Sequence, residues 1–164
     1  MKQKTNSMRF LEAQKIPYRV HEFSPEIRSA DEVADVLGIP RSQVYKTLVV
    51  TRERGRPLLV MIAGDKSLDL KRLAKALGEK KLSMASHKEA EALTGLEVGG
   101  ISALSLLHKG FSVYADQEIL DLPEVYVSAG VRGINLSLRP GDLLRVTRAQ
   151  VVQAAQSEKH EVAR

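Results

Sequence analysis

The sequence predicts an α+β fold: a single compact domain around a mixed, mostly antiparallel sheet of six or seven strands with flanking helices. The chain has 164 residues, about the length of one domain, and no Pro/Gly/Ser-rich linker divides it. Hydrophobic residues make up 43% and charged residues 27%, which is typical of a globular protein with its own core. Helix and strand signals alternate without a regular βαβ order. We therefore expect one domain over residues 1–156 and a polar tail over residues 157–164.

Local signals in the first part of the chain predict two helices and three strands. Pro17 ends the first helix. Ser29 and Glu32 form a capping box that begins the second helix, and Gly38 ends it. The run Leu58–Ala63 is apolar on both faces and is therefore expected at the centre of the sheet. The expected elements are a helix over Asn6–Lys15, a strand over Tyr18–Phe23, a helix from Ser29 to Gly38, and strands over Val44–Thr51 and Leu58–Ala63.

The second part is predicted to contain three more helices and four more strands. A stripe of leucine and alanine after Ser67 indicates an amphipathic helix that Ser67 caps and Gly78 ends. Capping boxes at Ser86–Glu89 and Thr147–Gln150 are expected to begin two further helices, the first ending before Gly95. The four strand candidates are Phe111–Asp116, Glu124–Ser128, Ile134–Leu138 and Leu143–Val146.

Composition excludes several classes of site. The chain has no cysteine, which rules out a disulfide scaffold, a protein thiolate nucleophile and a zinc site built on Cys ligands. Its four histidines are dispersed, so we expect no metal site and no cofactor. The longest apolar run, Leu58–Ala63, is far too short to span a bilayer, and no signal peptide is visible at the N-terminus. We expect a cytoplasmic protein without a membrane partner.

The net charge of +5 is compatible with a polyanionic partner, and its distribution is uneven. Six Lys and Arg against two acidic residues lie between Lys66 and Lys81. Lys71, Arg72 and Lys75 oppose the leucine stripe of their helix, so they are either an ordinary solvated face or contacts to an RNA backbone. Aromatic residues make up only 4%, which argues against a surface that stacks successive bases.

Lys46 is the first candidate for chemistry. In an extended strand it shares its face with Val44, Leu48 and Val50, and an ammonium among aliphatic neighbours needs a partner. One interpretation is an anchor for a phosphate or carboxylate. The other is a lysine at a strand end whose amine reaches water.

Two glycine-containing segments are weaker candidates. In Thr94–Ser102 the glycines allow backbone N–H groups to approach an oxyanion, although a tight turn after a helix explains them equally well. Ser128–Asn135 lies between two strands and is foremost a turn, in which Arg132 has the charge to meet a phosphate.

Several segments in order resemble one family. They are Val44-Tyr45-Lys46-Thr47-Leu48-Val49-Val50, Leu68–Gly78, Thr94-Gly95, Val98-Gly99-Gly100-Ile101-Ser102 and Val125–Gly133. Together they resemble the YbaK/ProX aminoacyl-tRNA deacylases, relatives of the editing (insertion) domain of prolyl-tRNA synthetase, over about residues 8–155.

The resemblance implies trans-editing: hydrolysis of mischarged aminoacyl-tRNA, with Cys-tRNA(Pro) as the expected substrate. Lys46 is then the catalytic residue, and the aminoacyl group lies in a pocket that needs no protein nucleophile. The substrate-binding residues expected on this basis are Phe23, Gly99, Gly100, Ile101, Ser102, Ser128, Gly130, Arg132 and Asn135. The expected partners are the acceptor end of mischarged tRNA, with Lys71, Arg72 and Lys75 on its backbone, and prolyl-tRNA synthetase as a second candidate.

The sequence departs from the family pattern at four positions. Ala103 and Ser105 replace a proline and a glycine of the G-G-I-S-P-x-G loop, Phe23 replaces a tyrosine, and Asn135 stands where many members have aspartate. The departures leave other activities open: an Ala- or Ser-tRNA deacylase, or a catalytically silent module that binds tRNA or a synthetase. A Schiff-base enzyme using Lys46 is a further alternative.

Overall fold

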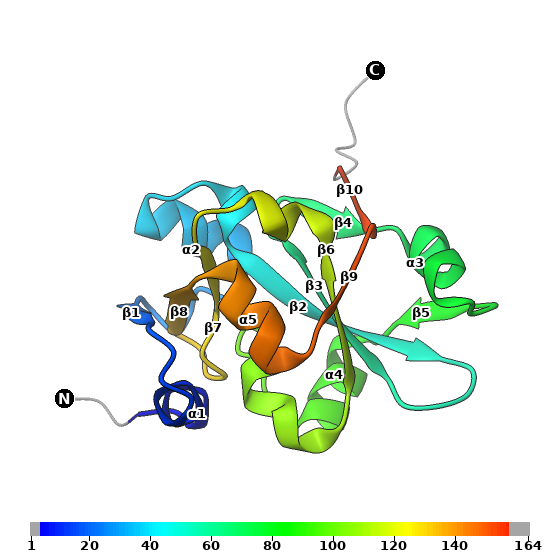
Figure 1. Cartoon of the computed structure of the whole chain (residues 1–164), viewed down its shortest axis with the longest axis horizontal. Coiled ribbons are helices and arrows are strands. Elements are labelled where there is room, and N and C mark those ends of the chain that lie inside the picture. The colour runs from blue at the N-terminus through cyan, green and yellow to red at the C-terminus, as the bar shows by residue number, and fades with distance from the viewer. Residues whose placement is uncertain (1–3, 158–164) are drawn as a thin grey trace.

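A five-stranded sheet runs through the middle of the protein, with helices on both of its faces (Figure 1). The computed structural model describes residues 4–157. The strands lie in the order β5 (Leu82–Met84), β2 (Tyr45–Arg52), β3 (Leu58–Ala63), β6 (Ser112–Asp116) and β9 (Gln150–Val152). The pairings from β5 to β3 are antiparallel and those from β3 to β9 are parallel. All six residues of β3 are buried, which confirms its predicted central place.

Two smaller antiparallel sheets flank this one. β1 (Arg19–Glu22), β8 (Ile134–Leu138) and β7 (Val125–Ser128) form a three-stranded sheet in that order, and β4 (Lys66–Leu68) pairs with β10 (Ala155–Ser157). The α+β class and the antiparallel majority of pairings are thus confirmed. The strands of residues 4–157 are nevertheless divided among three sheets instead of forming one of six or seven. Among the described residues, an isolated parallel bridge between Val44, immediately before β2, and Tyr126 of the edge strand β7 links the three-stranded sheet to the central one.

Five α-helices and three 3₁₀ turns connect the strands within the described residues. They are α1 (Asn6–Ala13), α2 (Ala30–Leu37), η1 (Arg41–Gln43), α3 (Leu70–Leu77), α4 (His87–Thr94), η2 (Ala103–Lys109), η3 (Gln117–Asp121) and α5 (Pro140–Thr147). The predicted helix ends at Gly38, Gly78 and Gly95 are confirmed, each glycine having a positive φ. The Ser86–Glu89 capping box is complete. At Ser29 the hydroxyl accepts from the Glu32 N–H and donates to its carboxylate, so this box lacks its return bond to the backbone.

Three predictions about the elements were wrong: the cap of α3, a strand over Leu143–Val146 and a helix beginning at Thr147. Asp69 caps α3, because Ser67 is inside β4. Leu143–Val146 is helical, since Pro140 fixes the first turn of α5 and Leu143 and Thr147 then lie one turn apart, both buried. Thr147 consequently ends this helix, its hydroxyl donating to the Leu143 carbonyl at 2.7 Å, and no final helix follows in the described chain.

The last described residues form β9 and β10 instead. Asp116 orders the link between them, accepting from the Ala154 and Ala155 N–H groups at 2.9 Å each. Of the expected polar tail, Ser157 is the last residue of β10, and residues 158–164 lie outside the described residues.

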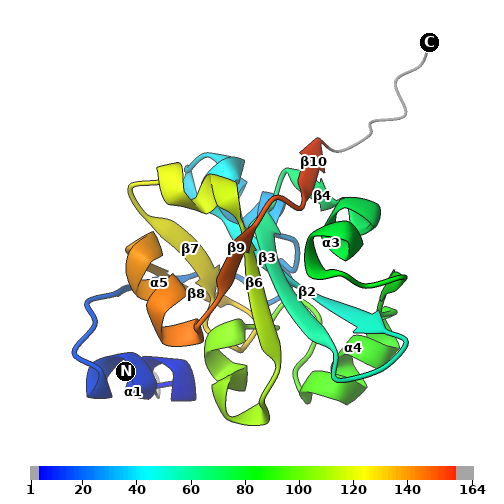
Figure 2. The ribbon, with the colours of Figure 1, turned by 45° about the vertical axis from the view of Figure 1, so that its right-hand side comes forward.

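The central sheet separates two hydrophobic clusters. Leu59 and Met61 of β3 face the larger one, which α1, α5 and η2 cover, and Val60 and Ile62 face a smaller one under α3 (Figure 2). A third small cluster lies beneath α2. Among residues 4–157, no helix is long and apolar enough to cross a membrane.

Candidate active site

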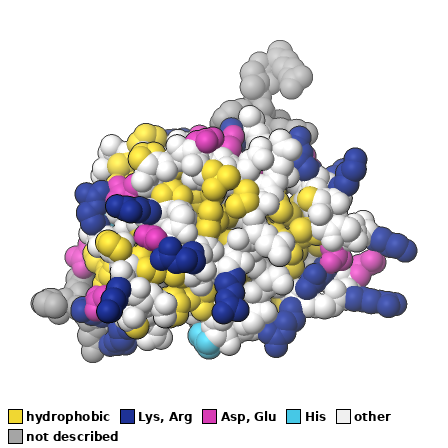
Figure 3. All heavy atoms as spheres, in the orientation of Figure 1, with side chains coloured by type: hydrophobic (Ala, Val, Ile, Leu, Met, Phe, Trp, Pro, Cys, Tyr) yellow, Lys and Arg dark blue, Asp and Glu magenta, His cyan; other side chains and the backbone are white. Residues whose placement is uncertain are grey.

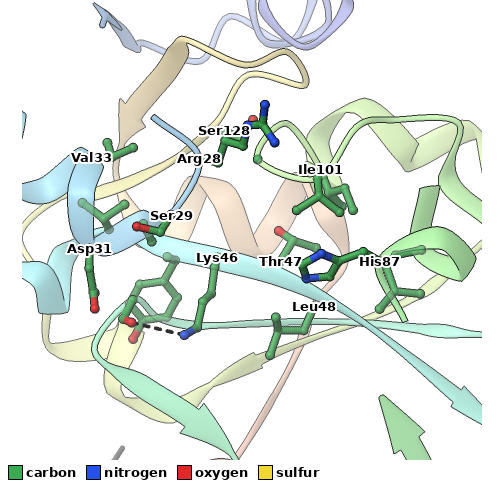
Figure 4. A pocket seen from close by; sticks show the side chains of 18 of the residues that line it. Arg28, Ser29, Asp31, Val33, Lys46, Thr47, Leu48, His87, Ile101 and Ser128 are labelled. Carbon is green, nitrogen blue, oxygen red and sulfur yellow. Dashed lines mark hydrogen bonds between the residues drawn. The ribbon is translucent and has the colours of Figure 1, made fainter. Parts of the chain in front are cut away.

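A cavity of about 320 Å³ lies along an open stretch of the edge of β2 (Figure 4). β5 pairs with β2 only over Val50–Arg52, and one further bond joins the Ala85 N–H to the Val49 carbonyl at 3.0 Å. Between that bond and the Val44 bridge, no described strand pairs with this edge. The N-terminal part of α2, the start of α4 and the loop at residues 98–101 surround the gap instead.

The open edge presents backbone groups to the cavity. In a strand, the N–H and C=O of alternate residues point to the same side. Val44 bonds toward β3, through the Gly64 N–H at 2.7 Å, whereas Val49 bonds toward the β5 side. The N–H and C=O of Thr47 therefore point the same way as those of Val49, into the cavity. They give a ligand one donor and one acceptor in fixed positions.

Lys46 contributes a positive charge to the cavity. Its Nζ donates to the Gly64 carbonyl at 3.1 Å, and no carboxylate of residues 4–157 forms an ion pair with it. The amine is thus held by one neutral acceptor while its other protons remain for a ligand. A lysine amine with this arrangement suits an anionic or strongly polar group.

Gly64 makes this arrangement possible through its lack of a side chain. A Cβ there would lie 2.8 Å from Ala30 Cβ, 2.9 Å from a carboxylate oxygen of Asp31 and 3.2 Å from the Val44 carbonyl. The end of β3, the beginning of β2 and the first turn of α2 converge at this point. The carbonyl that holds Lys46 is therefore fixed by three elements.

The predicted glycine loop forms the opposite wall. Gly99 has a φ of +94°, and a Cβ there would meet the Arg28 side chain at 3.0 Å. A Cβ on Gly100 would lie 3.0 Å from the Val131 backbone, so the loop packs closely between two segments. The Gly100 N–H donates to the Glu97 carbonyl at 2.8 Å, which excludes this amide from the oxyanion role considered for the loop.

Arg132 binds the backbone of this loop without lining the cavity. Its Nε donates to the Val98 carbonyl at 2.8 Å, and its Nη1 lies 3.5 Å from a carboxylate oxygen of Glu97. Its side chain is only 20% exposed, whereas that of Glu97 is 73% exposed. The guanidinium proposed for a phosphate is thus already engaged with the protein and lies outside the cavity lining.

The structure brings part of the predicted site together. Lys46, Gly99, Ile101, Ser128 and Asn135 line the cavity. The remaining predicted substrate contacts do not line it: Phe23 packs in the small cluster under α2, Gly100 against Val131, Ser102 at the start of η2, Gly130 beside Ser105, and Arg132 against Val98. Lys71, Arg72 and Lys75 are exposed on α3, away from the cavity.

The structure also shows where the four residues that depart from the family pattern lie. Ala103 is buried in the main core, and the Ser105 hydroxyl donates to the Ala129 carbonyl at 3.2 Å. Neither lines the cavity, and neither does Phe23. Asn135 does line it, so among these four positions it is the one that can alter the pocket directly.

Six polar residues of the cavity were not predicted as site residues from the sequence: Arg28, Ser29, Asp31, Tyr45, Thr47 and His87. The His87 ring points from the start of α4 toward Thr47 (Figure 4). The sequence feature that could have indicated His87 is its position directly after the helix cap Ser86, which fixes the first turn of α4. In the described residues, no group of three or more His, Asp and Glu is placed to hold a metal ion.

Tyr45 lies at the base of the cavity, and its side chain is buried. Burial raises the pKa of its phenol, and the nearby Asp116 and Glu118 raise it further. The phenol therefore stays protonated at neutral pH and cannot serve as a base.

Comparison with known proteins identifies the family. Residues 24–146 match the model of the aminoacyl-tRNA editing domain. The chain is 40% identical over 158 residues to EbsC of Enterococcus faecalis, a proposed Cys-tRNA(Pro)/Cys-tRNA(Cys) deacylase, which covers 95% of this chain and 96% of that protein. It is 29% identical over 130 residues to a proline–tRNA ligase of Thermodesulfovibrio yellowstonii, covering 76% of this chain and 22% of the ligase.

Solved structures agree with these relatives. The hypothetical protein APE2540 superimposes with a TM-score of 0.85 at 26% identity, covering 92% of this chain and 99% of that one. A proposed trans-editing enzyme for prolyl-tRNA synthetase gives a TM-score of 0.77 at 27% identity, covering 95% and 100%. The resemblance drawn from the sequence motifs is confirmed. The chain belongs to the aminoacyl-tRNA editing domain family.

Proposed function

We propose that this protein is a trans-editing deacylase that hydrolyses the ester of a mischarged tRNA, with Cys-tRNA(Pro) as its first substrate. The observation that carries the proposal is that Lys46 lines a cavity it shares with the glycine loop and an open strand edge, its amine held by the Gly64 carbonyl. The proposed activity of EbsC, which is similar over almost its whole length, supports the same substrate.

The chemistry needs little from the protein beyond positioning. An aminoacyl ester is already activated, and the cavity supplies fixed polar groups around its carbonyl. Water attacks the carbonyl carbon, the bond to the ribose oxygen breaks, and that oxygen takes a proton, which releases the amino acid and intact tRNA. Lys46 binds the terminal nucleotide by its phosphate or ribose. With a cysteinyl substrate, the substrate's own thiol attacks the carbonyl carbon first, the bond to the ribose oxygen breaks and that oxygen takes the thiol proton; water then opens the cyclic thioester to release cysteine.

The size of the cavity favours a small aminoacyl group. About 320 Å³ is near the lower end of the range for small-molecule sites. Cysteine, alanine and serine esters fit this limit better than esters of large side chains. A second expected partner is prolyl-tRNA synthetase, because a part of such an enzyme is similar to this chain. We expect the protein to act in the cytoplasm, where charged tRNA is used.

The test is hydrolysis of Cys-, Ala- and Ser-tRNA(Pro) by the purified protein and by Lys46→Ala. We expect release of one of the three amino acids, reduced about 10²- to 10³-fold in the variant, as for loss of a positioned transition-state donor. Lys66→Ala is the matched control, since Lys66 is also a strand lysine but lies outside the cavity lining. No release from any of the three esters would overturn the proposal.

The silent tRNA-binding module is the alternative from a different class. It was suggested by Ala103 and Ser105, and both lie outside the cavity lining. No observation on the cavity therefore favours it over the deacylase.

A further inference from the structure

The positive charge of the chain is concentrated at one end of the molecule. The hairpin residues 52–56 and the segment 71–81 together carry eight Lys and Arg against two Glu, a surplus of six. The whole chain has a net charge of +5, so all its other residues together sum to −1. We call these two segments the basic end.

The fold brings the two segments together. The strand pairing places Arg52 opposite Leu82, and Arg52 Nη1 lies 3.1 Å from a carboxylate oxygen of Glu79. The end of β2, the loop before β5 and helix α3 are therefore neighbours. Figure 3 shows Lys and Arg side chains standing out at this end, where Figure 1 places α3, β5 and the hairpin.

Most cations of the basic end lie close together in the chain and have no acidic partner among the described residues. Arg19, Arg41 and Arg145, elsewhere on the surface, form ion pairs with carboxylates at 2.6–3.1 Å. At the basic end, Arg52 is paired with Glu79, and Arg72 lies 3.8 Å from Asp69. The others form no ion pair with any residue of the described chain: Arg54, Arg56, Lys71, Lys75, Lys80 and Lys81. Like charges held close together without counter-charges weaken the folded state, which a polyanion bound there would offset.

We infer that the basic end binds the phosphate backbone of the tRNA body, as an electrostatic site separate from the cavity that holds the aminoacyl group. This rests on the proposed function for the identity of the RNA. The strand β5 connects the two sites: Lys81 immediately precedes it and Ala85, at the cavity, immediately follows it. Four residues of extended chain span at most about 13 Å, a distance over which a polynucleotide passes a few phosphates. The 3′ end can thus enter the cavity while the preceding phosphates lie along the basic end.

The test measures binding of uncharged tRNA(Pro), which requires no hydrolysis. The variant Lys80→Ala/Lys81→Ala removes two exposed charges that make no described ion pair. We expect weaker binding and a slope of log Kobs against log salt that is shallower by about two. Arg9→Ala/Arg139→Ala is the matched control, since it removes two exposed charges from α1 and from the start of α5 and should leave the slope unchanged.

A second measurement separates this inference from the proposed function. On full-length aminoacyl-tRNA, Lys80→Ala/Lys81→Ala should raise KM and leave kcat unchanged. On an aminoacyl-adenosine, which has no tRNA body, it should hydrolyse as the wild type does. Absence of hydrolysis by the wild type, with the tRNA-binding defect still present, would refute the deacylase and leave the basic end as an RNA site.

Two results would overturn the inference itself. One is wild-type affinity and salt dependence of tRNA binding in Lys80→Ala/Lys81→Ala. The other is unchanged tRNA binding together with lost binding to prolyl-tRNA synthetase, which would assign the basic end to an acidic protein surface.

Discussion

Replacing Arg132 by alanine should impair hydrolysis although this residue does not line the cavity. The change removes the hydrogen bond from Nε to the Val98 carbonyl at 2.8 Å and the weaker contact with Glu97 at 3.5 Å. A hydrogen bond from a charged donor is worth about 1.5–3 kcal/mol, whereas an ion pair with so exposed a carboxylate is worth about 1 kcal/mol or less. Most of the stabilisation therefore comes from the bond to Val98, which fixes one wall of the cavity.

If the whole of that bond energy positions the loop, kcat/KM falls by about 10- to 150-fold in Arg132→Ala. The assay is deacylation of the best of the three aminoacyl-tRNA substrates under kcat/KM conditions. Hydrogen exchange at residues 98–102 should show faster opening of the loop in the same variant.

Glu97→Ala is the matched control, because it removes the ion pair and leaves the bond to Val98 intact. We expect it to lose no more than about fivefold in kcat/KM, the equivalent of about 1 kcal/mol. Equal losses in Arg132→Ala and Glu97→Ala would refute the reasoning. So would a loss in Arg132→Ala without faster exchange in the loop, which would instead support the direct phosphate contact expected from the sequence.

Three further predictions concern stability. Burial lowers the pKa of His21 below its value near 6.5 in an unfolded chain, and the charge of Arg19 lowers it further. The contribution of His21 to stability is therefore complete above that value and is lost as the pH falls. The free energy of urea unfolding should decrease between about pH 7.5 and pH 5.5, and His21→Gln should reduce this decrease. Gly64→Ala should cost about 1–3 kcal/mol in urea unfolding and lower deacylation, because its Cβ meets α2; an unchanged midpoint would contradict the close packing. Ser86→Ala should cost about 1 kcal/mol in thermal or urea unfolding, whereas Ser86→Asp should restore the cap.

Local signals account for the elements that the sequence predicted correctly. The Ser86 box and the glycine at the end of α3 act within a few residues, and the apolar run of β3 is long enough to identify a central strand. The three-residue strands β4, β5, β9 and β10 were missed because pairing with distant residues creates them. The apolar run Leu143–Val146 fits a strand and a helix equally well, and only the packing of α5 decides between them.

The candidate site was likewise predicted where its signals are local and missed where its contacts are long-range. Alternation along β2 placed the side chain of Lys46, but nothing near it in the sequence indicates its acceptor, Gly64, 18 residues further on. The close contact between Gly99 and Arg28 is likewise long-range. For Arg132 the residue type suggested a phosphate, and only the fold reveals that its guanidinium already has a protein acceptor.

The cavity and the basic end depend on the same short strand. β5 pairs with β2 for three residues, and the Ser86 cap then turns the chain into α4, so no strand covers the backbone of Thr47. A longer β5 would close the edge and fill the space where the ester is expected to bind. In the other direction β5 leads to Lys80 and Lys81, beside the arginines of the hairpin. Ser86→Val, which removes the cap and favours extended chain, should therefore lower hydrolysis more than Ser86→Ala does while leaving salt-dependent tRNA binding intact; loss of both together would mean that the two sites are not separable.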